Sequence, residues 1–212
     1  VLVPTRQPEN PDCAAALIDG YQDGRLNYDR YVAYAHMMVA VDVEACAAAI
    51  ARLAQSADLR RQLGDNGRQR VREVFDWSRI LPRYQALWAE QRERLDHFRK
   101  AGGARPQREP GMPNPLRMFA HYPSALITAH SRLHRDGTTA VSARALRELS
   151  MWRFADGWLG DAAMVERAWQ ALPLRAEPAV TLDQWGRTLQ IDPMQAQRLA
   201  AWMAKTGLAV IG

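Results

Sequence analysis

Apolar side chains recur at helical spacing in the middle of the chain, in a segment otherwise rich in charge. The recurring positions are Ile80, Tyr84, Leu87 and Trp88. Residues three and four apart lie on one face of an α-helix, so this spacing predicts a long amphipathic helix. Asp76 or Ser78 can cap its start, just after a helical run, Arg68–Val74, that stops at Phe75. A stripe of this kind is usually packed against the core of its own domain.

The first part of the chain reads as short strands and helical segments. Val1–Val3 and Met37–Asp42 are predicted strands, and the Pro- and Asn-rich Thr5–Asp12 is a predicted loop. Ala14–Asp19 is expected to form one or two helical turns.

Two helices are predicted to follow. The Ala-rich segment Val43–Gln55 begins after a capping residue, Asp42, and Ile50 and Leu53 are expected to face inward. A second helix, Ala57–Leu63, is expected to end at Gly64.

The segment Gly102–Pro115 contains three glycines and four prolines, which is typical of a linker. We therefore predict a first domain over residues 1–100, a linker over 101–115 and a helical appendage over 116–212. Within the appendage, a helical pattern begins again in Thr138–Trp158.

Two short helices with clear end signals are predicted near the C-terminus. The signals are Thr181 and Asp192 as caps, Pro193 in a first turn and Gly207 as a stop. Residues 178–212 therefore resemble the helix-turn-helix of a winged-helix domain, with Leu208–Ile211 as a first wing strand. We expect this tail to pack against Met151–Leu172, whose aromatic residues need apolar cover.

The chain carries a formal net charge of +5, and the basic excess lies in residues 57–108, which hold 13 Lys or Arg against 7 Asp or Glu. Solvated helix faces are the ordinary interpretation, and an anionic membrane surface is the alternative partner. Only two cysteines are present, so neither a disulfide framework nor a CxxC metal pattern is possible, which fits a reducing, cytoplasmic setting.

One pair of histidines has metal-ligand spacing. His130 and His134 are four residues apart and would share a face if they lay on a helix. No third ligand stands at a recognisable spacing, so partly exposed helix histidines are the favoured interpretation.

A series of motifs surrounds the predicted long helix. It runs Leu59-Arg60-Arg61-Gln62-Leu63-Gly64-Asp65-Asn66-Gly67-Arg68-Gln69-Arg70, then Phe75-Asp76-Trp77, then Tyr84. This order and spacing resemble the C-terminal end of retaining, nucleotide-sugar-dependent glycosyltransferases of the GT-B architecture, which are built from two Rossmann-like domains. The resemblance covers roughly residues 1–95.

The resemblance implies a fold and a function. The fold would be mainly α: a truncated α/β (Rossmann-like) remnant of the GT-B C-terminal domain, followed by a helical domain with a winged-helix-like tail. The long helix would cross back to the N-terminal domain. The parent protein would transfer a sugar from a nucleotide sugar to an unknown acceptor, such as a glycan or a lipid. It would lie in the cytoplasm or peripherally at the inner membrane face.

The resemblance places no catalytic, cofactor-binding or metal-binding residue on this chain. The family's donor site uses a Glu-x₇-Glu segment that precedes the strand matched by Val1–Val3. Since the chain starts without Met, we expect it to be a piece of a longer product, with the missing N-terminal glycosyltransferase region as its partner. The fragment alone is expected to be inactive, and it needs no cofactor.

The alternative function is that of a helix-turn-helix module for protein interaction or nucleic-acid binding. Residues 178–212 carry only Arg187, Arg198 and Lys205 against two aspartates, whereas a DNA reader normally presents a clearly basic face.

We therefore predict no DNA binding. An anisotropy titration with random duplex DNA at low salt should give no saturable signal, because too few cations are available to contact phosphates. Micromolar affinity that falls steeply with salt, and that is lost in Arg198→Ala, would contradict this prediction.

Overall fold

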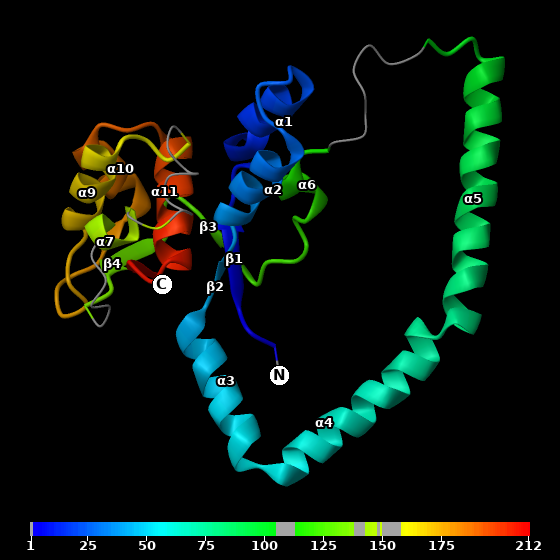
Figure 1. The fold of residues 1–212 in the computed structure, drawn as a ribbon, viewed down its shortest axis with the longest axis horizontal. Coiled ribbons are helices and arrows are strands. Elements are labelled where there is room, and N and C mark those ends of the chain that lie inside the picture. The colour runs from blue at the N-terminus through cyan, green and yellow to red at the C-terminus, as the bar shows by residue number, and fades with distance from the viewer. Residues whose placement is uncertain (1, 105–112, 138–142, 148, 150–157) are drawn as a thin grey trace. The chain divides into compact units, whose positions relative to one another are not determined.

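The computed structural model describes residues 2–104, 113–137, 143–147, 149 and 158–212 (Figure 1). The described chain is mainly helical and contains two sheets of three strands each. It divides into two compact units. The mixed unit comprises Val1–Ala47 together with Glu109–Gly212, and the helical unit comprises Ala48–Arg108.

The first sheet of the mixed unit has the order β2-β1-β3. Its central strand, β1 (Thr5–Pro8), pairs antiparallel with β2 (Ala40–Val41) and parallel with β3 (Ala125–Ile127). The predicted strand at Val1–Val3 is therefore wrong: the strand lies in the segment predicted to be a loop, because Thr5–Pro8 has partners on both edges. The antiparallel pairing of β1 with β2 also differs from the parallel strands of a Rossmann-like sheet.

Helices of the mixed unit follow β1 directly. They are the 3₁₀ turn η1 (Pro11–Ala14), α1 (Ala15–Gln22) and α2 (Tyr28–Met37). The side chain of Asn27 caps α2 by accepting a hydrogen bond of 2.9 Å from the backbone N–H of Arg30. Because α2 runs to Met37, the strand predicted over Met37–Asp42 is shortened to β2.

The second sheet has the order β5-β4-β6, and both of its pairings are antiparallel. Its strands are β4 (Arg132–Arg135), β5 (Val180–Thr181) and β6 (Ala209–Ile211). The helices around it are α7 (Ala143–Arg147), α9 (Ala162–Gln170), α10 (Leu182–Leu189) and α11 (Pro193–Lys205). The short helix α6 (Pro115–Met118) instead contacts η1.

The end signals of the tail helices are confirmed. Thr181 and Gln184 form a reciprocal capping box at α10, and the Asp192 side chain accepts from the N–H of Gln195 at 2.9 Å. Gly207 follows α11 with a φ of +74°, a conformation that favours glycine. The strand β6 pairs with β4, which precedes both helices in the chain.

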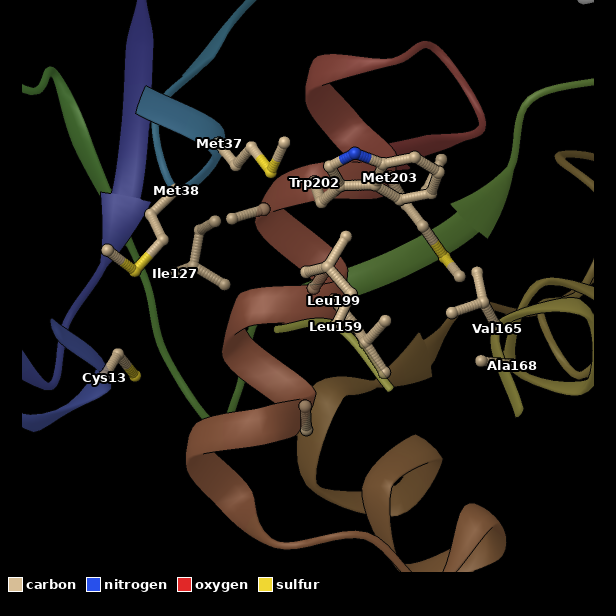
Figure 2. Packing of buried hydrophobic residues seen from close by; sticks show 14 of the residues in the cluster. Cys13, Met37, Met38, Ile127, Leu159, Val165, Ala168, Leu199, Trp202 and Met203 are labelled. Atoms are coloured by element: carbon tan, nitrogen blue, oxygen red, sulfur yellow. The ribbon is translucent and has the colours of Figure 1, made fainter. Parts of the chain in front are cut away.

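The core of the mixed unit is organised around α11. This helix contacts strands of both sheets, and its central side chains are buried on every side. Figure 2 shows Leu199, Trp202 and Met203 between two groups of apolar residues. One group is Met37, Met38 and Ile127, and the other is Leu159, Val165 and Ala168. A helix that is apolar all round is expected to be a buried helix.

The helical unit consists of successive helices with exposed surfaces. The helix α3 (Val43–Gln55) leads into it, followed by α4 (Ala57–Arg70), a π-helical turn η2 (Val71–Phe75) and α5 (Trp77–Lys100). The predicted cap is confirmed, since the Asp76 carboxylate accepts from the N–H of Ser78 at 2.9 Å.

Two expectations in this region are wrong. The helix α4 continues through Gly64, because the glycine is surrounded by open space and one interior glycine costs a helix only about 1 kcal/mol. Ile50 does not face inward: its side chain is 62% exposed, because this part of α3 belongs to a unit whose described helices have no buried residues.

The compact units do not follow the predicted boundaries at residues 100 and 116. The pairing of β1 with β3, and the contacts of α11 with β1 and η1, join residues before the helical unit to residues after it. Most of the predicted linker, 105–112, lies outside the described residues, as do 138–142, 148 and 150–157 of the predicted helical segment and of its aromatic cluster.

Removing a side chain at the centre of α11 should destabilise the mixed unit strongly. Leu199 is completely buried, so Leu199→Ala is expected to lower the free energy of unfolding by about 2–5 kcal/mol. Val32→Ala, at a position 43% exposed on α2, is the matched control and should change it by less than about 0.5 kcal/mol. Urea unfolding monitored by tryptophan fluorescence measures both, and equal effects would contradict the central role of α11.

Candidate functional site

An apolar stripe on the helical unit is exposed along its length. It comprises Phe75, Trp77, Leu81, Tyr84, Leu87, Trp88, Leu95 and Phe98, all at least 45% exposed. Trp77 is 70% exposed and Trp88 is 59% exposed, and the rings of Tyr84 and Trp88 lie 6.0 Å apart. The stripe therefore finds no cover among the described helices of its own unit. A contiguous apolar surface of this kind usually marks an interaction site.

The stripe follows from the local sequence. The side chain of Asp76 starts α5 immediately after the π-helical turn, and Arg70 lies over the ring of Phe75 at 5.7 Å. From Trp77 onward, large apolar residues recur every three or four positions, so the helix collects them on one side. Arginines and lysines between them keep this element basic.

The charged residues of the helical unit pair mostly within their own helices. Arg61 pairs with Asp58 at 3.3 Å and Arg94 with Glu90 at 2.5 Å, both between neighbouring turns. Such exposed pairs contribute little stability each. They hold the unit helical without supplying the apolar cover that the stripe lacks.

A small cavity of about 90 Å³ in the mixed unit is lined by ionised groups. Arg175 lies 2.5 Å from Glu44 and 3.9 Å from Asp136, and Arg6 lies 3.9 Å from Asp42. The hydrogen bond from Arg175 to Glu44 raises the pKa of the guanidinium. Each arginine already faces a carboxylate, so the cavity is not an anion site.

The two histidines with ligand spacing are not on a helix. His130 lies in the turn before β4, and His134 lies on β4 with its Nε2 3.1 Å from the carbonyl oxygen of Glu177. The expectation of helix histidines is therefore wrong, because β4 pairs with both β5 and β6. The described residues include no group of three or more His, Cys, Asp or Glu arranged to hold a metal ion.

Cys13 is not suited to nucleophilic chemistry. Its side chain is buried, and its Sγ lies 3.4 Å from Oε1 of Gln197. Burial raises the pKa of this thiol to about 11, so it stays protonated at neutral pH. Cys46 is half-buried, and both cysteines are free.

The basic side chains of α11 contact other parts of the mixed unit. The guanidinium of Arg198 lies over the ring of Trp158 at 4.8 Å, and Trp158 also stacks with Tyr34 at a centroid distance of 5.2 Å. Lys205 donates to the carbonyl oxygen of Val39 at 3.0 Å. The second helix of the predicted helix-turn-helix thus directs its residues to the core.

Comparison with family models, curated proteins and solved structures finds no match to this chain. In the part of the chain that the structure describes, none of the helices combines the length and the apolar composition needed to cross a membrane. The candidate site therefore rests on the geometry alone, and the stripe on α5 is its main feature.

The raised pKa of Cys13 predicts a pH dependence of stability. The folded thiol keeps its proton up to about pH 11, whereas the unfolded thiol loses it near pH 9.0, so stability should fall by about 2–3 kcal/mol as pH rises through this interval. Chemical unfolding at pH 8.5 and pH 11 measures the fall. Cys13→Ala should show a smaller fall than the wild type, while Cys46→Ala should match the wild type. Identical falls in all three proteins would contradict the prediction.

Proposed function

We propose that this chain is the C-terminal portion of a nucleotide-sugar-dependent glycosyltransferase of the GT-B architecture. The parent enzyme would transfer a sugar to an acceptor that its N-terminal region selects. This chain supplies no catalytic group of its own in the proposal.

The observation that carries the proposal is the uncovered stripe on α5. The resemblance requires a helix that leaves its own domain after an aromatic pivot and crosses to the N-terminal domain. Phe75-Asp76-Trp77 is a break between η2 and α5, and α5 then presents apolar residues that its own unit does not bury. Burial of such side chains against a partner is favourable by about 1.5–3 kcal/mol for each large residue.

The strands of the mixed unit contribute less support. A Rossmann-like remnant calls for parallel strands, and β1 and β2 are antiparallel. The proposal therefore rests on the motif order and exposed surface of residues 59–98. It also includes a winged-helix-like tail. The basic excess of the helical unit is compatible with a peripheral position at the inner membrane face in the cytoplasm.

The packing of α11 argues against the alternative function in nucleic-acid binding. A recognition helix must present side chains to the groove of DNA, whereas α11 is buried between two sheets. A role of the tail in protein contacts remains compatible with the glycosyltransferase proposal.

The proposal is tested by comparing the 212-residue chain with the longer product that the proposal implies. Nucleotide release from a panel of UDP-, GDP- and ADP-sugars is the measurement. We expect turnover from the longer product and none from the 212-residue chain, because the phosphate, ribose and sugar contacts lie upstream. Turnover by the short chain above a no-protein blank, or inactivity of the longer product with every donor, would contradict the proposal.

Variants of the longer product test the stripe itself. Trp88→Ala should lower the activity about tenfold or more, since a buried tryptophan is a typical hot spot of an interface. Glu90→Ala, two residues away on the same helix, should leave the activity nearly unchanged. If the longer product is active but the two variants have equal activities, the stripe on α5 does not contribute to the function.

A further inference from the structure

The helices α2 and α6 belong to the mixed unit (Figure 1). Residues of both helices line an apolar groove. Its volume is about 440 Å³, within the range typical of sites for small ligands. Apolar side chains on its walls include Tyr31, Val32, Leu116, Met118 and Phe119. Val32, Met118 and Phe119 are each more than 40% exposed, so the groove is open to solvent.

Hydrogen bonds between distant segments hold the walls in place. The Tyr31 hydroxyl donates to the carbonyl oxygen of Pro113 at 3.0 Å, and Nε2 of Gln7 donates to the carbonyl oxygen of Leu116 at 3.2 Å. Nδ2 of Asn114 donates to the carbonyl oxygen of Pro11 at 2.7 Å, and its Oδ1 caps α6. The groove is thus formed before any ligand arrives, which lowers the ordering cost of binding.

One end of the groove is lined by a histidine, with a lysine behind it. His36 and Val39 lie on its wall, and Lys205 lies behind them with Nζ 3.4 Å from Nε2 of His36 and 3.0 Å from the carbonyl oxygen of Val39. Among the described residues that line the groove, none is an Asp or a Glu. The charge at this end therefore has no carboxylate partner on the groove wall.

We propose that this groove binds a single-chain amphiphilic anion of the fatty-acid type. Its tail would lie along Leu116 and Phe119, and its carboxylate would face His36, with the charge of Lys205 directly behind that side chain. The apolar walls favour burial of an alkyl chain, and the charged end decides the sign of the headgroup. The proposal is independent of the glycosyltransferase function, since it uses only the mixed unit.

The protonation of His36 and Lys205 should respond to a bound anion. Burial lowers the pKa of Lys205, and burial together with the neighbouring Lys205 lowers the pKa of His36. A carboxylate placed beside both groups favours their charged forms and so opposes these shifts.

Calorimetric titration of the whole chain with two amphiphiles of equal tail length tests the proposal. Decanoate and decyltrimethylammonium, both below their micellar concentrations, differ in the sign of the headgroup. We expect one decanoate per chain and an affinity for decyltrimethylammonium that is at least about tenfold lower. Equal affinities, several weak sites, or no decanoate binding would overturn the proposal.

Variants locate the site. Val32→Glu places a carboxylate in the groove and should weaken decanoate binding about tenfold. Leu126→Glu, also at a position 43% exposed but on β3 outside the groove, should leave it unchanged. Lys205→Gln should lower the affinity for decanoate about fivefold, which is the effect expected of a partly exposed charge pair. It should not lower the affinity for decyltrimethylammonium. Circular dichroism verifies that each variant is folded, and wild-type affinity in Val32→Glu would overturn the proposal.

Discussion

The burial of α11 is the constraint on which the mixed unit depends. Each sheet has only three short strands, too little to form a stable layer without apolar cover. By contacting both sheets, α11 supplies one shared core to strands that are far apart in sequence. The same burial explains why a helix pair with clear helix-turn-helix end signals offers no free second helix. The local sequence specifies the two helices, and the tertiary packing determines that the second one is not free to bind a partner.

The helical unit is stabilised by local interactions and not by burial in a core. Its helices are specified by caps, by pairs between neighbouring turns and by helix-favouring residues, and its described residues bury no large side chain within the unit. Residues 48–104 therefore have a defined local structure but an exposed apolar surface that needs a partner to be buried. This contrast with α11 is the physical reason for assigning the interaction surface to α5.

The sequence predicted what depends on neighbouring residues. The caps at Asp76, Thr181 and Asp192 and the stop at Gly207 were all predictable, because each depends on residues within one or two turns. The pairings of β1 with β3 and of β4 with β6 were not, since strands of three or four residues give no signal of their distant partners. The position of His134 depends on such a pairing, and so does the apolar groove, whose walls come from segments more than a hundred residues apart in sequence.

The pairing of Arg6 with Ala125 makes the helical unit an insertion within the mixed unit. During synthesis, β1 leaves the ribosome well before β3, so the sheet cannot close until the whole insertion has been made. Closing this long loop has an entropic cost that local helices do not bear, and contacts distant in sequence form slowly. The inserted helices can therefore form while β1 still lacks a neighbour on one edge. An unpaired edge at that stage is a site where nascent chains can associate wrongly.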